Sequence, residues 1–511
     1  MRNIIRIAAL GASMFFACLS AGAQTDATRA ATAQPAVRRV VPRSGTDGRP
    51  NLIVLIADQW RGQALHFKGL EKVLTPNLDK LASGGVVVER MASNYPVCSP
   101  ARAMLMTGMY PLRNGVDGNC TSETAPFHCE LRSADTCWSD ILHGRHYQTA
   151  YIGKWHLDSP HPPYIPTSNN KPPVKWNEWT EPARRHGFVY WYAYGTYEEH
   201  LRPMYWSTDA PRDSFQYVDQ WGPIHEVDKA IEYLDARKGT APFAMVVSMN
   251  PPHTAYNLVP QKYKDLYKDV PLDSLVTDPD IPAAGTPMGD AYRRDVKDYY
   301  ACMSGVDEQI GRLLAYLEKT DRDNNTIILF ISDHGNCLGK HDQPTKNNFY
   351  EESVSVPFIL QWKGHLRPHL DKELLMSYPD IYPTLLGLMH LHADIPAGVQ
   401  GVDYSGRLSG KARRGSGPPL PDAQYLIGDL APGKEASGFR GIRTHRYKLA
   451  VQYDAKAKTV RHYLFDLQRD PYELDNIYTE DPEKVVPALQ QKLMTWLRAQ
   501  GDSFAEIPGV I

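Results

Sequence analysis

The sequence predicts an α/β fold: a large, mostly parallel sheet flanked by helices, and a smaller C-terminal α+β subdomain that contains an antiparallel sheet. Continuous apolar runs bounded by polar residues, such as "NLIVLIA" at 51–57, are typical of strands that are buried on both faces. Between such runs, apolar residues recur every three or four positions, as they do in amphipathic helices. Strands that alternate with helices favour a parallel sheet. After about residue 400, shorter strand patterns surround polar turns.

The first 23 residues are predicted to be a signal peptide. Two arginines precede an apolar run, and Ala21–Ala23 fits a cleavage site of small residues. The run is too short for a membrane span, so we expect no stable span. Residues 24–48 have the polar, Ala- and Pro-rich composition of a flexible linker. The protein is therefore expected in the periplasm or outside the cell. A lipid anchor at Cys18 is the alternative, although the leucine that such signals prefer is missing.

A catalytic domain is predicted over residues 49–400. Its longest helical pattern repeats apolar residues from Val296 to Leu317. Three apolar runs follow the first one, and they lie at 149–153, 243–250 and 326–335.

Residues 401–511 are predicted to form the C-terminal α+β subdomain. A loop rich in Gly, Pro and Arg opens it, and residues 438–467 read as antiparallel strands around a polar turn. The last helix has one apolar face, formed by Val486, Leu489, Leu493, Trp496 and Leu497.

Composition and charge are those of an ordinary globular protein. The 511 residues are 42% hydrophobic and 22% charged, and the net charge is −2. Because there is no basic excess, we expect no nucleic-acid partner, and an anionic substrate must be held by a local cluster of cations. Six of the seven cysteines remain after loss of the signal peptide, which permits disulfides. Cys120, Cys129 and Cys137 are close enough in sequence for a local disulfide, and its pairing stays open.

Each predicted strand of the catalytic domain ends in polar residues suited to catalysis. Asp58 and Gln59 follow the first strand, "GKWH" (153–156) the second, "NPPH" (250–253) the third and "SDHG" (332–335) the fourth. Any one of them could be a turn, a helix cap or a structural histidine. In a parallel sheet, however, the carboxyl ends of the strands meet at one crevice. Together, the four endings predict one shared site.

Four of these residues have side chains that suit a metal ion, namely Asp58, Gln59, Asp333 and His334. Oxygen-dominated ligands favour a hard cation, so we expect one Ca²⁺, with Mg²⁺ or Mn²⁺ as alternatives. Further positive charge would come from Arg102, Lys154 and Lys346. A metal ion and cations around a small crevice suit a compact oxyanion, because the charge that develops during its transfer must be stabilised.

Cys98 lies in "CSPAR", at the predicted start of a helix. Pro100 occupies a first-turn position, and Arg102, four residues after the cysteine, shares its helical face. A single thiol in an exported protein normally pairs or packs in the core. The Cys-x-Pro-x-Arg spacing favours a chemical role instead.

Besides "CSPAR", the sequence contains "ADQ", "GKWH", "PPH" and "SDHG". In these motifs and in their order along the chain it resembles the formylglycine-dependent sulfatases of the alkaline-phosphatase superfamily. The resemblance covers residues 49–400, and "LFDLQRDPYELDNI" near the end resembles the closing segment of that family. It implies an alkaline-phosphatase-like fold and hydrolysis of sulfate esters. It also implies that a separate maturation enzyme oxidises Cys98 to formylglycine (3-oxoalanine), whose hydrate is the nucleophile.

Site roles follow from the same resemblance. The implied metal ligands are Asp58, Gln59, Asp333, His334 and modified residue 98. Arg102 would hold the hydrate, with Lys154 and His156 beside it, and His253 and Lys346 would contact the sulfate and the leaving oxygen. Gln59 stands where many members have Asp, and His334 where many have Asn. Lys340 is the alternative to Lys346 for the lysine that contacts the substrate.

In the implied reaction, one hydroxyl of the hydrate attacks sulfur and His253 protonates the departing alcohol. His156 then deprotonates the second hydroxyl, and collapse to the aldehyde expels sulfate. A plain serine or cysteine lacks that second hydroxyl.

A sulfated carbohydrate is the expected substrate. Residues 174–221 are rich in Trp and Tyr, which could form a platform for sugar rings or a packed hydrophobic cluster. Two other functions stay open. One is a phosphodiesterase or phosphonate monoester hydrolase of the same superfamily, and the other is a non-catalytic glycan-binding relative in which Cys98 is unmodified.

Overall fold

The computed structural model describes residues 48–410, 418–430, 436–481 and 483–510. The predicted signal peptide, Cys18 and residues 24–47 of the predicted linker lie outside the described residues. Within the described part, no helix is long and apolar enough to cross a membrane. All six cysteines in this part are buried free thiols.

A ten-stranded sheet forms the centre of the large domain, in the order β10-β2-β9-β8-β1-β7-β3-β4-β5-β6. The central strands β3, β7, β1 and β8 pair in parallel, whereas β9 and β5 run antiparallel to both of their neighbours. The predicted, mostly parallel sheet is therefore confirmed. Its strands are β1 (Asn51–Ala57), β2 (Val86–Ala92), β3 (Gln148–Lys154), β4 (Tyr190–Tyr194), β5 (Met204–Ser207), β6 (Gln216–Tyr217), β7 (Phe243–Met249), β8 (Thr326–Ser332), β9 (Phe358–Trp362) and β10 (His369–Ser377).

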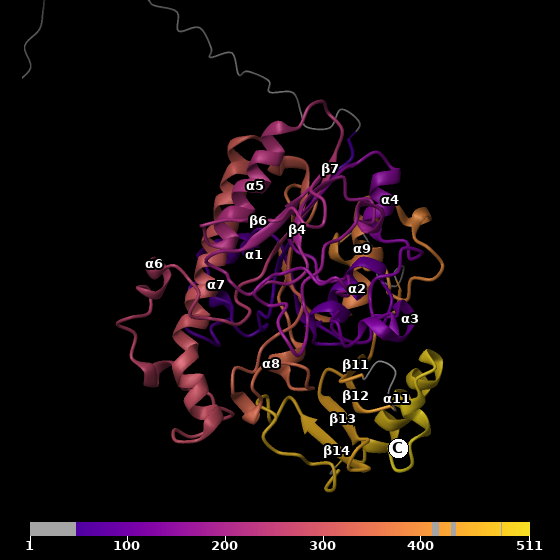
Figure 1. Cartoon of the computed structure of the whole chain (residues 1–511). Helices are drawn as coiled ribbons and strands as arrows, with labels where there is room; N and C mark the ends of the chain where they lie inside the picture. Colours follow the sequence, from indigo (N-terminus) through magenta and orange to yellow (C-terminus); the bar gives the residue numbers. More distant parts are fainter. Residues whose placement is uncertain (1–47, 411–417, 431–435, 482, 511) are drawn as a thin grey trace, which may run out of the picture. The chain divides into compact units, whose positions relative to one another are not determined.

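Helices cover both faces of this sheet (Figure 1). Strand β1 is buried along its whole length, because Leu52 and Val54 enter one core while Ile53 and Leu55 enter the other. The first core includes residues of α2, α4 and α9, and the second includes residues of α1, α5 and α7. The helices of the large domain are α1 (Pro76–Ser83), α2 (Cys98–Thr107), α3 (Pro111–Asn114), α4 (Trp138–Gly144), α5 (Gly222–Ala236), α6 (Gln261–Lys264), α7 (Pro287–Lys319), α8 (Glu351–Val354) and α9 (Ile381–Leu388).

The C-terminal part contains a separate antiparallel sheet in the order β11-β12-β13-β14. As predicted, the last helix packs on it, with Leu493 and Leu497 in one core with Ile442 and Leu449. Strand β11 is an addition that the sequence patterns do not indicate. The elements are α10 (Ser405–Leu408), β11 (Gln424–Gly428), β12 (Gly438–Arg443), β13 (Tyr447–Asp454), β14 (Thr459–Asp466) and α11 (Val486–Gln500).

The aromatic residues of 174–221 mostly form packed structure and not a sugar platform. Seven of the eleven Trp and Tyr residues in this range are buried, and they are Trp191, Tyr192, Tyr194, Tyr197, Tyr205, Trp206 and Trp221. They join the hydrophobic cores on the two faces of the sheet because β4 and β5 extend it. Trp176 differs, since 36% of its surface is exposed.

Candidate active site

The predicted catalytic and metal-binding residues come together at the carboxyl ends of the central strands. Asp58 follows β1, Lys154 ends β3 and Asp333 follows β8. Cys98 is the first residue of α2, which follows β2. One ligand atom each of Asp58, Cys98, Asp333 and His334 lies within 4.8 Å of the other three, and all four residues are buried. These side chains therefore share one site.

The Cys98 thiol lies among charged groups at the N-terminus of α2. Its Sγ is 3.2 Å from His334 Nε2, 3.2 Å from Lys346 Nζ and 3.7 Å from Asp58 Oδ1. Burial and Asp58 oppose ionisation of the thiol. The ammonium groups of Lys154 and Lys346 outweigh both and hold the pKa of Cys98 well below its usual range. The helix N-terminus favours negative charge as well, so position 98 suits an anionic nucleophile.

Arg102 lies one helical turn into α2 and orients the two carboxylates. Its Nε donates to Asp333 Oδ2 at 3.0 Å, and its Nη2 donates to Asp58 Oδ2 at 3.1 Å. Its Nη1 donates to Lys154 O and to Ser248 Oγ, both at 2.8 Å. These hydrogen bonds fix a buried guanidinium between the carboxylates. The guanidinium also interacts electrostatically with Cys98.

Lys154 is held at the end of β3 by a close approach to β7. Gly153 has a φ of +98°, and a Cβ at this position would lie 2.1 Å from Ser248 O, so only glycine fits here. Lys154 Nζ then lies 2.7 Å from Asp58 Oδ2 and donates to Asn250 Oδ1 at 3.0 Å. A buried ammonium thus points at the same carboxylate that Arg102 contacts.

Lys346, and not Lys340, lies in the site. Lys346 Nζ is 3.2 Å from Gln59 Oε1 and 3.0 Å from His334 Nε2. Lys340 belongs to a different buried cluster, where its Nζ lies 2.6 Å from Asp278 Oδ2. The geometry thereby decides between the two lysines that the sequence left in competition.

His156 has a buried imidazole that interacts with the Cys98 thiol. Only 2% of the residue is exposed, and among the described residues neither ring nitrogen has a partner at hydrogen-bond geometry. Burial holds the pKa of the imidazole below its usual value, so the ring is neutral and can accept a proton. Its ring centroid lies 6.3 Å from that of Trp176, an exposed aromatic residue of 174–221. Buried polar atoms without partners are rare, which points to a ligand or a reacting group at this position.

His253 follows β7, and the backbone carbonyl of the next residue, Thr254, orients its ring. Its Nδ1 lies 2.9 Å from Thr254 O, and because a carbonyl can only accept, Nδ1 carries a hydrogen. Nε2 is therefore the nitrogen that can give or take a proton. Glu198 Oε1 lies 3.6 Å from Nδ1, on the far side of the ring from Nε2.

Three polar residues of the site were not assigned a role from the sequence, namely Ser248, Asn250 and Glu198. Ser248 and Asn250 are polar residues at the carboxyl end of an apolar strand, the same signal that singled out Asp58. Glu198 lies in a loop after β4, where no periodic pattern marks a functional residue.

The family model "Sulfatase" matches residues 50–391. The chain belongs to the sulfatase family. A second model, "N-sulphoglucosamine sulphohydrolase, C-terminal", matches residues 339–500. This sulfatase is a sulfuric ester hydrolase of the alkaline-phosphatase superfamily, as the motifs predicted.

Known sulfatases match this chain over most of its length. The chain is 37% identical to an "Endo-4-O-sulfatase" of Bacteroides thetaiotaomicron, over 89% of this chain and 92% of the relative. It is 32% identical to an "Ulvan-active sulfatase" of Formosa agariphila, over 91% and 84% of the two chains. The crystal structure of a putative sulfatase from Bacteroides fragilis superposes with a TM-score of 0.84 and 47% identity, over 90% of this sulfatase and 98% of that chain.

The donors in the sulfatase site fit a divalent cation. Asp58 is held ionised, because Lys154 and other neighbouring cations outweigh burial and keep its pKa well below the usual range. Asp333, His334 and the Gln59 amide add oxygen and nitrogen donors. The Lys346 ammonium lies within 3.2 Å of three of the donor groups, those of Gln59, Cys98 and His334. Hard oxygen ligands with one imidazole suit the divalent metal that this family generally uses.

Exchanging each lysine for methionine should separate catalysis from stability. We expect Lys346→Met to lower turnover of sulfate esters by about 10²-fold or more, because a preorganised cation beside residue 98 is lost. Lys340→Met is the matched variant. It leaves Asp278, Asp280 and Glu352 without their ammonium partner, so we expect a loss of about 3–5 kcal/mol in the free energy of unfolding.

Urea unfolding measures the free energy of unfolding, and steady-state kinetics measure the turnover of sulfate esters. Lys340→Met should keep its turnover per folded molecule. A large stability loss in Lys346→Met with unchanged turnover would make Lys346 a structural residue.

Proposed function

We propose that this sulfatase hydrolyses sulfate esters of a carbohydrate through a formylglycine made from Cys98 by a separate maturation enzyme. In this proposal one Ca²⁺ is held by Asp58, Gln59, Asp333, His334 and residue 98, and Mg²⁺ or Mn²⁺ is the alternative. The protein acts after export, in the periplasm or outside the cell. The observation that carries the proposal is the position of residue 98, buried between two carboxylates and three basic side chains at a helix N-terminus.

The names of the relatives support a carbohydrate substrate. One is called an endo-4-O-sulfatase and another is described as active on ulvan. Trp176, exposed beside the His156 imidazole, offers an aromatic surface next to the reacting position. Export fits a substrate that is a large glycan outside the cytoplasm.

Each basic group has a task in this reaction. A cation held by Asp58, Gln59, Asp333 and His334 would supply Lewis-acid polarisation at residue 98 when bound. Lys154 and Lys346 neutralise the sulfate, because both ammonium groups are directed toward the Cys98 Sγ position. His156 accepts the proton of the second hydroxyl through its buried, neutral imidazole. His253 donates a proton from Nε2 to the departing oxygen.

A mass spectrum of the tryptic peptide Met91–Arg102 tests the proposal, together with turnover of paired sulfate and phosphate esters. Formylglycine at residue 98 and repeated turnover of the sulfate ester are the expected results. Unmodified cysteine in fully active protein, or equal repeated turnover of the phosphate ester, would overturn the proposal.

Replacement of His253 should reveal its role as general acid. We expect His253→Ala to lower turnover of sugar sulfates by ~10²–10⁴-fold, because an alkoxide leaves poorly without a proton. An activated aryl sulfate releases a stable phenolate, so its turnover should fall much less. The two substrate classes are compared at saturation.

Glu198→Gln is the control for this experiment, since it keeps the shape of the neighbouring side chain and removes its charge. It should leave the turnover of both substrate classes close to that of the unchanged enzyme. Equal losses on both substrate classes in His253→Ala would show that His253 binds sulfate and does not donate a proton.

A further inference from the structure

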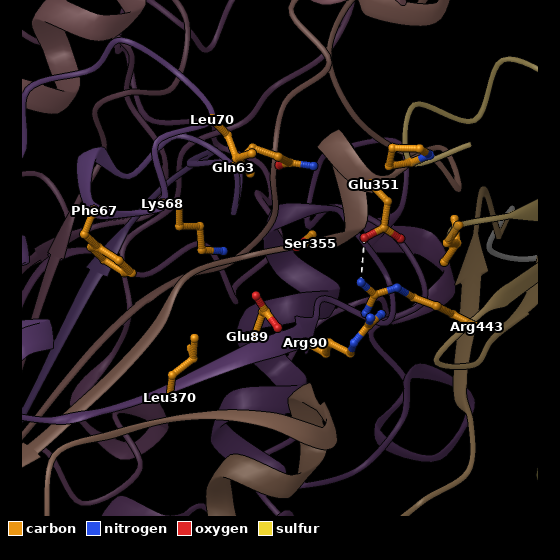
Figure 2. A pocket seen from close by; sticks show the side chains of 12 residues that line it. Gln63, Phe67, Lys68, Leu70, Glu89, Arg90, Glu351, Ser355, Leu370 and Arg443 are labelled. Atoms are coloured by element: carbon orange, nitrogen blue, oxygen red, sulfur yellow. Dashed lines mark hydrogen bonds and ion pairs between the residues drawn. The ribbon is translucent and has the colours of Figure 1, made fainter. Parts of the chain in front are cut away.

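A second cavity lies between the edge of the large sheet and the C-terminal sheet. It has a volume of about 440 Å³ and is lined by side chains from several segments of the chain (Figure 2). Phe67 and Lys68 come from the segment after β1, Glu89 and Arg90 from β2, and Arg443 from β12. None of the residues proposed for catalysis or metal binding lines it.

This cavity is distinct from the catalytic crevice. The C-terminal sheet approaches the crevice near the end of β11, where Asn347, next to Lys346, donates to Asp429 at 3.1 Å. Arg443 is paired with Gln424, at the opposite end of β11. A strand rises by about 3.3 Å per residue, so the length of β11 separates the two places by ~13 Å.

Two cations in the cavity have no partner. Among the described residues, neither the Lys68 ammonium nor the Arg90 guanidinium has an ion pair or a hydrogen bond, and Figure 2 shows both side chains directed into the cavity with Glu89 between them. Desolvation lowers the pKa of Lys68 to about 8. Burial and the guanidinium of Arg443 lower the pKa of Arg90 too. A bound anion would relieve both effects.

Other lining groups suit a sugar better than a bare anion. The Phe67 ring is 38% exposed and offers a face to the C–H groups of a pyranose. Glu89 would repel an inorganic anion but can accept hydrogen bonds from hydroxyl groups, and Gln63 can donate and accept them. Arg443 is already paired with Glu351, at 2.6 Å. Three cations and two carboxylates leave one net positive charge in the cavity.

We propose that this cavity binds an anionic sugar residue of the same glycan chain whose sulfate ester is hydrolysed in the catalytic crevice. Lys68 and Arg90 hold its sulfate or carboxylate, Glu89 and Gln63 hold its hydroxyls, and Phe67 covers its apolar face. This inference rests on the proposed function. It predicts that long substrates bind at two places on the sulfatase and short ones at one.

Kinetics of the double variant Lys68→Gln/Arg90→Gln test the proposal. The substrates are ulvan and glycosaminoglycan octasaccharides, the matching disaccharides, and 4-nitrophenyl sulfate. We expect KM for the octasaccharide that is turned over best to rise about tenfold or more, because two charge-assisted contacts are lost. The value of kcat, and both constants for the disaccharide and the aryl sulfate, should not change. Lys72→Gln, an exposed lysine outside the cavity, is the matched control.

Calorimetry of octasaccharide binding, in protein with Cys98→Ala so that no turnover occurs, gives a readout that does not depend on catalysis. Affinity should fall between pH 7 and pH 9 as Lys68 loses its proton, and Lys68→Gln should remove this dependence. The charged groups that face Lys68 are Glu89, Glu351 and Arg443.

An unchanged KM for the octasaccharide in the double variant, or an equal change in Lys72→Gln, would overturn the proposal. Tight binding of inorganic phosphate in the cavity, as strong as that of the octasaccharide, would make it a simple anion site and overturn it as well. A failure of the proposed function would look different, because sulfate release from every substrate would be absent while octasaccharide binding remained sensitive to Arg90→Gln.

Discussion

Replacing Cys98 with serine is expected to convert repeated turnover into at most one turnover per chain. A serine hydroxyl at this position keeps the surrounding ammonium groups, 3.2 and 3.9 Å from the Cys98 Sγ, and can still attack sulfur. The resulting serine sulfate has no second hydroxyl for His156 to deprotonate, so sulfate cannot be expelled by collapse to an aldehyde. Removal of a nucleophile typically lowers turnover on the order of 10⁴–10⁶-fold.

The measurement combines a burst assay with the mass of the Met91–Arg102 peptide. The serine variant should show one equivalent of released alcohol and a peptide that carries one added SO₃ group. Cys98→Ala is the matched control, and it should show neither a burst nor an adduct. Steady turnover in the serine variant would mean that an ordinary hydroxyl suffices, and the formylglycine mechanism would fall.

Much of the fold was accessible to sequence reasoning because burial leaves a strong pattern. The strands β1, β3, β7 and β8 are buried on both faces and therefore read as continuous apolar runs. Their carboxyl ends carry the polar residues, so topology alone indicated which motifs would meet. Strand β11 escaped prediction because its five residues carry no clear pattern of their own.

Details of the site depended on contacts that no spacing encodes. Lys340 and Lys346 lie in one polar segment, and only the position of Asp278 beside Lys340 shows that the latter is bound elsewhere. From the sequence, the aromatic residues of 174–221 could equally line a surface or fill a core. In the structure most of them are buried, because β4 and β5 extend the large sheet. Local pattern fixes which face of an element is apolar, but not which distant segment packs on it.

Electrostatic roles were the hardest to foresee. The resemblance implied that Arg102 holds the hydrate, and this role stays a prediction, since residue 98 is an unmodified cysteine here and the guanidinium is bonded to Asp58 and Asp333. A side chain four residues after Cys98 can reach back to residue 98 or across to the strands, and spacing does not decide between the two.

The other large effect is expected from Asp333→Asn, which should remove the cation. Asp333 carries one of the two buried carboxylates in the cluster, and its amide replacement keeps the shape but loses the charge. Metal analysis after gel filtration should fall from one ion per chain to almost none. A bound cation contributes several kcal/mol to stabilising the charge of the transition state, so turnover of sulfate esters should fall ~10³-fold or more.

Stability should fall as well, because Arg102 loses one of its two carboxylate partners while staying buried. Asp502→Asn is the matched control: it breaks another buried arginine–aspartate pair, with Arg440, far along the chain in the C-terminal part. It should lower the free energy of unfolding by a comparable few kcal/mol but keep full metal content and turnover per folded molecule. Asp333→Asn that retains one equivalent of metal and unchanged kcat would place the cation elsewhere. If Asp333→Asn loses metal and kcat while Asp502→Asn keeps both, the cation binds at the carboxyl end of β8. The same result shows that the loss is not the general effect of breaking a buried ion pair.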